Sequence, residues 1–369
     1  MNAYRGRSLV CAFCMTAVLI SCGTQTEGIT PQPATPTSLA SETQTATPRA
    51  PTQMPSATSI PTLEFGSIDG RPARLQLTYV IHLSARTDWL VGVDFGCGES
   101  APPCLGEPVT LLEAHAPAPP PFPIQGYDWS PSGQLLALAM ASPTDDSTDL
   151  FVAEARASGI DNIRNVTDSA LVWEADPTWL PDGSAILVHR SYLSDEEPEL
   201  VAIRPDGSLA EGLLSRLEMR GAYYVRLSPA GDKVAFAVAD LPALLLYVAD
   251  LDGTYLLQVT QSGWVGRAAF TPGGDLLAYC WSLDGTSRGG QLMVADLTVQ
   301  SPPAVIVADA PGCSSPAWSP DGEWIAFAAL DRPLSRIQIV RPDGTDRMIV
   351  ETGPNDAGSP GWRRLPSEP

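Results

Sequence analysis

The chain has 369 residues and a formal net charge of −20 at pH 7, and 44% of its residues are hydrophobic. This length suffices for one large domain or two ordinary ones, each with a buried core. Because Asp and Glu outnumber Lys and Arg by 42 to 22, the surface repels phosphate backbones and anionic lipid heads, so nucleic acid is not an expected partner.

Residues 1–21 have the pattern of a bacterial signal peptide. Two arginines precede the apolar run SLVCAFCMTAVLI (8–20), which is too short to favour a membrane span. The run LISC (19–22) resembles the lipobox of bacterial lipoproteins, and this resemblance implies that Cys22 is acylated and becomes the first residue after cleavage. An ordinary signal peptide that contains a cysteine is the alternative.

Residues 22–62 are predicted to form a disordered linker after the lipidated cysteine. Thr, Pro, Ser and Ala dominate this stretch, which has too few large apolar side chains to offset the entropy of ordering. A flexible chain of this length spans roughly 35–40 Å, which suits a tether between a membrane and a folded head. We therefore expect an exported protein, anchored by lipid to the outer face of the cell membrane or in the periplasm or outer membrane.

One sequence motif recurs along the rest of the chain: an apolar strand, a turn that begins with Pro and contains Gly, and a second apolar strand. The five copies are YDWSPSGQLLALAM (127–140), PTWLPDGSAILVHR (177–190), VRLSPAGDKVAFAV (225–238), AAFTPGGDLLAYCW (268–281) and PAWSPDGEWIAFAA (316–329). Their turn prolines lie 43 to 50 residues apart, which indicates a solenoid, an array or a propeller. Pro presets the φ angle of a type I turn, and Gly supplies the left-handed residue that closes a bulged hairpin. Because the strand after the turn is apolar on both faces, its sheet must lie between two others.

Each copy is followed by a second pair of β-rich runs with its own turn. Four strands and no helix in a unit of this length are typical of a propeller blade. The residues WSPDGEWIAF (318–327) and IQIVRPDGT (337–345) resemble the TolB-type propeller repeat, a relative of the WD-type repeat. The resemblance covers about residues 70–365 and implies an all-β propeller. It carries over no partner contacts, because we expect no counterpart of that family's N-terminal α/β domain before the first strands.

Two fragments supply a further blade. Residues 74–83, 88–96 and 108–114 are predicted to form three strands without an opening Trp strand, whereas SPGWRRL (359–365) matches the opening strand and then stops. We therefore predict that residues 63–369 form a six-bladed β-propeller of four-stranded antiparallel blades, closed by the C-terminal strand joining the N-terminal blade. Such closure leaves no free sheet edge.

Four cysteines remain in the predicted propeller, an even number in an exported domain: Cys97, Cys104, Cys280 and Cys313. They permit three pairings. We favour Cys280–Cys313, because the end of a second strand and the loop entering the next blade emerge on the same face. Cys97 and Cys104 flank a loop short enough for a local bridge. Free thiols and the other pairings are the alternatives, and the spacing does not fit a zinc site.

The motif GTSRG (285–289) fits the G-x-S-x-G pattern of a hydrolase nucleophile elbow. An elbow requires a strand-to-helix turn in an α/β sheet with His and acid partners, whereas this segment falls in a loop between two strands of a blade. We therefore expect no catalysis at Ser287, assign no catalytic residue and do not expect an enzyme.

Metal and cofactor sites are not expected either. The three histidines, His82, His115 and His189, are scattered, and we expect two of them to pack between blades. The acidic loops 145–149 and 194–199 contain residue types that bind calcium, but solvated hairpin loops are the commoner outcome.

Candidate binding residues follow from position alone. Propellers usually bind ligands or proteins at the mouth of the central channel, where each innermost strand begins. The residues predicted to lie there are Tyr127, Asp128, Asp176, Tyr224, Arg226, Arg267 and Ser315. Their mixture of charge and aromatic character suits a peptide, glycan or protein, and a water-filled channel without a ligand is the alternative.

The sequence therefore indicates a monomeric, lipid-anchored propeller that acts as a non-catalytic binding or scaffold module at the cell envelope. A cell-envelope enzyme acting on glycans or peptides at the channel is one alternative, and a solute-binding or sensor lipoprotein is another. Histidines and carboxylates converging on the channel would favour the enzyme. A closed, deep pocket lined with aromatic residues would favour the solute binder.

Overall fold

The computed structural model describes residues 74–96, 104–116, 123–142, 147–156, 159–192, 199–210, 221–251, 255–283, 285, 290–299, 302–331 and 333–365. Thr62–Pro369 form one compact unit. The predicted signal peptide, linker and lipidated Cys22 lie outside the described residues, as do Cys97, Ser287 and most of the two acidic loops. In the described part of the chain, no helix is long and apolar enough to span a membrane.

The described residues form 23 β-strands arranged in antiparallel units. The N-terminal unit has the order β23-β1-β2-β3 and consists of β1 (Leu75–Ser84), β2 (Thr87–Phe95), β3 (Val109–His115) and β23 (Asp356–Arg364). The next units comprise β4 (Ile124–Trp129), β5 (Leu135–Ala141), β6 (Thr148–Arg156) and β7 (Gly159–Asn165), then β8 (Val172–Trp179), β9 (Ile186–Tyr192) and β10 (Glu199–Ile203).

The remaining units follow the same order along the chain. They comprise β11 (Ala222–Leu227), β12 (Lys233–Asp240), β13 (Ala243–Asp250) and β14 (Leu256–Gln258), then β15 (Trp264–Phe270), β16 (Leu276–Ser282), β17 (Gln291–Asp296) and β18 (Ala304–Val307), and last β19 (Ser314–Trp318), β20 (Ile325–Asp331), β21 (Leu334–Val340) and β22 (Met348–Ile349). One parallel bridge joins β6 to β8 and another joins β13 to β15, so these units merge pairwise into larger sheets.

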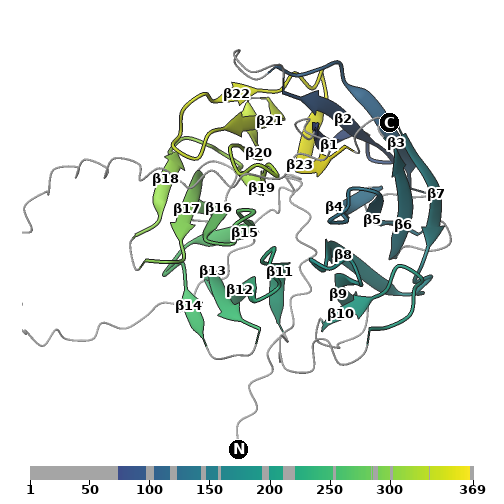
Figure 1. Cartoon of the computed structure of the whole chain (residues 1–369), viewed down its shortest axis with the longest axis horizontal. Coiled ribbons are helices and arrows are strands. Elements are labelled where there is room, and N and C mark those ends of the chain that lie inside the picture. Colours follow the sequence, from purple (N-terminus) through teal and green to yellow (C-terminus); the bar gives the residue numbers. More distant parts are fainter. Residues whose placement is uncertain are drawn as a thin grey trace, which may run out of the picture. The chain divides into compact units, whose positions relative to one another are not determined.

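The first strands of these units surround a common centre (Figure 1). We call β4, β8, β11, β15, β19 and β23 the inner strands. Each contacts the next in that order, and β23 contacts β4. The C-terminal strand, yellow in Figure 1, lies beside the purple β1, with which it pairs from Leu75–Arg364 to His82–Asp356.

The strand after the turn is buried on both faces, as its apolar pattern predicts. On β20 and just before it, Trp324, Ala326 and Ala328 pack into the cluster shared with β1 and β2. The alternate residues Ile325 and Phe327 pack into the opposite cluster, which is shared with β16 and β17. A sheet in the middle of such packing gains hydrophobic burial from both sides.

Tryptophan side chains link neighbouring inner strands. Three indole N–H groups each donate to a backbone carbonyl of the preceding inner strand at 3.1 to 3.2 Å, namely Trp179 to Asp128, Trp318 to Ala269 and Trp362 to Ala317. In the repeat, this tryptophan stands two residues before the turn proline. One residue type at one repeat position therefore both fills the core and ties adjacent units together.

The link between β23 and β4 runs through a threonine. The indole Nε1 of Trp129 donates to Thr78 Oγ1 at 3.0 Å, and the Thr78 hydroxyl donates to the carbonyl of Gly361 at 3.2 Å. Arg363 adds a second tie, because its guanidinium donates to Gln76 Oε1 and to the carbonyl of Arg156, and stacks over the Trp129 ring at 4.4 Å. The C-terminal strand is thus held by both flanking units.

The disulfide Cys280–Cys313 is present, with the two Cα atoms 5.5 Å apart, which confirms the favoured pairing. It joins the end of β16 to the loop that precedes β19, and so connects two consecutive units. Cys104 is also disulfide-bonded.

Replacing both Cys280 and Cys313 by Ala should lower the free energy of unfolding by about 3–4 kcal/mol, because a bridge across a loop of this length restricts the unfolded chain by that amount. Urea unfolding under non-reducing conditions measures the change. An unchanged midpoint would show that the bridge contributes nothing to stability.

Removing residues 359–369 should lower the melting temperature by about 10 °C or more, since it deletes Trp362, Arg363 and most of β23. The matched control removes residues 366–369 alone and should melt like the full chain. Equal melting of the two truncated chains would contradict the role given to β23.

Candidate functional site

Every inner strand is interrupted by a bulge within the five residues before the repeat position that tryptophan occupies in four of them. The pairing of each inner strand with its neighbour in the same unit shifts register once. At four of these bulges a residue other than glycine has a positive φ: Asp176 (54°), Tyr224 (54°), Ser315 (49°) and Ser359 (48°). Such left-handed backbone is strained and is found preferentially at functional sites, and a bulge re-aims the side chains around it.

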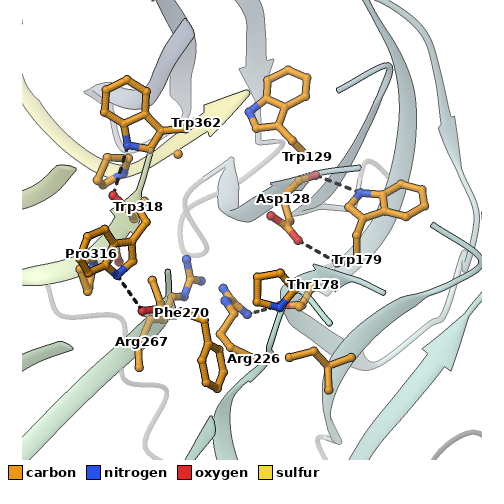
Figure 2. A pocket seen from close by; sticks show the side chains of 18 of the residues that line it. Asp128, Trp129, Thr178, Trp179, Arg226, Arg267, Phe270, Pro316, Trp318 and Trp362 are labelled. Atoms are coloured by element: carbon orange, nitrogen blue, oxygen red, sulfur yellow. Dashed lines mark hydrogen bonds between the residues drawn. The ribbon is translucent and has the colours of Figure 1, made fainter. Parts of the chain in front are cut away.

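The inner strands enclose a channel with a cavity of about 280 Å³. Residues from all six inner strands line it, and the arginine side chains of β11 and β15 point into its middle (Figure 2). This volume is just below the usual range for ligand pockets of about 300–1,000 Å³, so it suits a small molecule or a narrow segment of chain.

The wall of the channel is divided by chemistry. The charged side chains that line it come from β4, β11 and β15, and Asp176 of β8 joins them through its salt bridge with Arg267. Those on β19 and β23 that occupy the corresponding positions are small and neutral: Ser315, Ala317, Ser359 and Gly361. A ligand in this channel would therefore face a charged wall on one side and a small-residue wall on the other.

Arg267 crosses the channel from β15 to reach two other inner strands. Its guanidinium forms a salt bridge with Asp176 of β8 and approaches the carbonyl of Gln125 of β4 at 3.4 Å. Gly126 makes room for this crossing, because a Cβ there would lie 2.8 Å from Nη2 of Arg267. Burial lowers the pKa of Arg267 to about 10, so the group stays charged at neutral pH.

Arg226 is held by neutral groups. It donates through Nη1 to the Thr178 hydroxyl of the preceding inner strand and to the carbonyl of Val225 at 2.9 Å. Burial lowers its pKa, and the nearby Asp128 carboxylate offsets part of that effect.

Asp128 is anchored by the backbone of the next inner strand. Its Oδ2 accepts from the amide of Trp179 at 2.8 Å. Burial raises the pKa of Asp128 to about 6, against the opposing effects of Arg226 and of its hydrogen bonds. The carboxylate is therefore ionised at neutral pH and takes up a proton in mildly acidic solution.

Five of the seven predicted site residues line the channel: Tyr127, Asp128, Arg226, Arg267 and Ser315. Asp176 joins them through its salt bridge with Arg267. Tyr224 instead packs against the hydrophobic cluster formed with β12, β15 and β16. The hydroxyl of Tyr127 is engaged with Thr78 Oγ1 at 3.0 Å, so this residue presents no free hydroxyl to the channel.

The lining residues that sequence reasoning missed include Thr178 and Ser359. Thr178 stands three residues before its turn proline, as Asp128 and Arg226 do, and Ser359 stands three residues before its tryptophan, as Ser315 does. Applying the same offset to every repeat would have found both.

The histidines lie away from the channel. His82 Nδ1 contacts the buried Asp88 at 2.8 Å, and His115 lies on the surface beside Glu113. His189 packs against the tilted ring of Tyr223 in the neighbouring unit, which confirms its predicted packing between blades, and burial lowers its pKa. Within the described ranges, no three metal-ligating side chains come together.

The channel-forming fold has known counterparts. No protein-family model matches the chain, and no curated protein matches it. TolB from Acinetobacter baumannii is similar with a TM-score of 0.60 and 17% identity, over 78% of this chain and 66% of that chain, slightly less than two thirds of its length.

Two further solved structures are similar. A putative TolB from Agrobacterium tumefaciens has a TM-score of 0.51 at 15% identity, over 80% of this chain and 100% of that chain. A chain of the nidogen–laminin complex has a TM-score of 0.53 at 11% identity, over 78% of this chain and 98% of that chain. At these identities the likeness shows the fold alone, which is a TolB-like β-propeller.

Gly126→Ala should destabilise the protein by about 1–3 kcal/mol, because the new Cβ displaces the Arg267 guanidinium. In an Arg267→Met background the same change should cost less than about 0.5 kcal/mol, since nothing is left to displace. Urea unfolding of the four proteins in this cycle measures the coupling. Equal costs in both backgrounds would contradict the crossing of the channel by Arg267.

Proposed function

We propose that the chain is an exported, lipid-anchored β-propeller of six blades that works as a non-catalytic binding or scaffold module at the cell envelope. The cycle of contacts among the inner strands and the pairing of β23 with β1 support six blades closed by the C-terminal strand. The lipobox-like LISC (19–22) and the Thr- and Pro-rich residues 22–62 support a lipid anchor on Cys22 and a tether.

The observation that carries a binding role is the channel wall. Three charged side chains, Asp128, Arg226 and Arg267, line one cavity of about 280 Å³, and Asp176 is joined to Arg267 by a salt bridge. They come from four separate strands, and each is positioned by contacts with another inner strand or with its own. Charged groups that are held in place and partly removed from water are suited to binding a ligand, because they are already oriented and lose little hydration when the ligand binds. The similarity to a chain of the nidogen–laminin complex, an assembly of proteins, is in keeping with a partner-binding propeller.

The small volume also supports a second candidate, a solute-binding or sensor lipoprotein. Several aromatic side chains, among them Trp129, Trp179 and Trp318, contribute to the lining of the cavity. A cavity of this size fits a solute better than a folded partner, which would have to bind at the mouth.

Retention of a partner from the protein's own envelope extract tests the binding role. The immobilised full chain should retain a partner that the double variant Ser315→Asn/Ser359→Asn loses at least tenfold, because the larger side chains narrow the channel. Asn tolerates the left-handed backbone at both positions, so the fold should survive, as a melting curve checks.

The matched control is Ser184→Asn in an exposed turn outside the channel, which should retain the partner like the parent chain. Equal retention by the channel variant, or turnover of an envelope polymer by the parent chain, would overturn the proposal.

A further inference from the structure

The two acid–base pairs of the channel are satisfied in different ways. Arg267 and Asp176 form a salt bridge. Among the described residues, Arg226 and Asp128 make no such contact. The contacts of Arg226 are a hydroxyl and a carbonyl, and that of Asp128 is a backbone amide. The channel therefore contains one positive and one negative group, both half-buried, that attract one another without forming a salt bridge.

This arrangement is costly for the empty protein. Burial raises the pKa of Asp128 and lowers that of Arg226, which means that the surroundings disfavour both charges. The other charged or titratable groups facing them are Arg267 from β15, Asp176 from β8 and the Tyr127 hydroxyl from β4. Arg267 also attracts the Asp128 carboxylate, but its salt bridge is formed with Asp176, so it makes no salt bridge with Asp128.

A bound molecule of either single charge would satisfy only one of these groups. An anion would pair with Arg226 and meet the Asp128 carboxylate, and a cation would pair with Asp128 and meet the Arg226 guanidinium. A molecule with both charges would satisfy both groups, because its negative end would pair with Arg226 and its positive end with Asp128 on the same wall.

The opposite wall provides the space for such a molecule. Ser315, Ala317, Ser359 and Gly361 leave the cavity of about 280 Å³ between themselves and the charged side chains. The two serine hydroxyls are hydrogen-bond acceptors that suit an ammonium group.

We infer that the channel binds a small zwitterion of the amino-acid type, with its carboxylate on Arg226 and its ammonium group on Asp128. The inference rests on the proposed function, in which the channel is the binding site, and specifies the chemistry of its ligand. The net charge of −20 acts in the same sense, because it attracts the ammonium group and disfavours a free acid.

Four probes with five carbon atoms test the assignment by calorimetric titration of the full chain. L-Norvaline and 5-aminopentanoate carry both charges at different spacings, whereas pentanoate carries the acid alone and pentylamine the amine alone. At least one zwitterion should bind at least tenfold more tightly than both singly charged probes. Equal affinity for a singly charged probe, or no binding of either zwitterion, would overturn the inference.

Variants identify the groups involved. Arg226→Met and Asp128→Asn should each weaken binding of the preferred zwitterion at least tenfold. Arg341→Met removes an equivalent charge outside the channel, over the ring of Trp324, and should leave binding unchanged. If Arg226→Met melts early, Arg226→Lys serves instead and should retain binding that the neutral variant loses. Equal affinities of the Arg226 and Arg341 variants would overturn the inference.

The pH dependence gives a separate readout. Because Asp128 must be ionised to hold the ammonium group, affinity should be constant above pH 7 and fall about tenfold per unit of pH below about 6, the pKa of Asp128. Asp128→Asn should abolish this dependence, and its persistence in that variant would contradict the assignment. If no zwitterion binds but Ser315→Asn/Ser359→Asn still loses the envelope partner, the proposed function stands and only the zwitterion is wrong.

Discussion

The contact on which the structure depends most is an indole N–H that donates to the backbone of the preceding inner strand. Each such hydrogen bond is worth only about 0.5–1.5 kcal/mol, but it comes with the burial of a whole tryptophan ring between two sheets. It joins successive units at Trp179, Trp318 and Trp362. The tryptophan stands at one fixed position of the repeat, so the same contact forms at each of these three residues. These contacts bring the inner strands around one centre.

Two inner strands lack the tryptophan at this repeat position, and they are the strands that supply the arginines of the channel. At the tryptophan position β11 has Leu227 and β15 has Phe270. Arg226 replaces the missing indole in part, since it donates to the side chain of Thr178 on the preceding inner strand. Arg267 goes further and joins its strand to Asp176, one unit beyond its immediate neighbour. The units that lack the common link are therefore tied together by the same charged groups that give the channel its chemistry.

The repeat made much of the fold predictable. Its turn prolines, and its strands that are apolar on both faces, predicted the hairpins and the sheets. The Cys280–Cys313 bridge was predicted because both cysteines were expected on the same face of the propeller. The partial copy of the repeat at residues 359–365 predicted that the C-terminal strand, β23, pairs with β1. These features depend on local turn chemistry and on a side-chain period of two, and both can be read along the chain.

The details of the site were less accessible. Arg267 and Asp176 are separated by 91 residues, and their meeting depends on the bulges and on the absence of a side chain at Gly126. A bulge adds residues to one strand of a pair and so changes which side chains face the channel. Tyr224 shares its bulge position and positive φ with Ser315 and Ser359, yet it packs into the hydrophobic cluster, a difference that the repeat position did not indicate. The relay from Trp129 through Thr78 to Gly361 unites three distant segments and had no local signal.

Hydrogen exchange of the tryptophan indole N–H groups, followed by NMR, tests most directly whether these links hold the proposed ring. The account predicts that the indole protons of Trp129, Trp179, Trp318 and Trp362 are all strongly protected and exchange with the same free energy, that of global unfolding. Exchange of the Trp362 and Trp129 indoles at a much lower free energy than the other two would show that the C-terminal strand opens independently, and would contradict a ring closed by that strand.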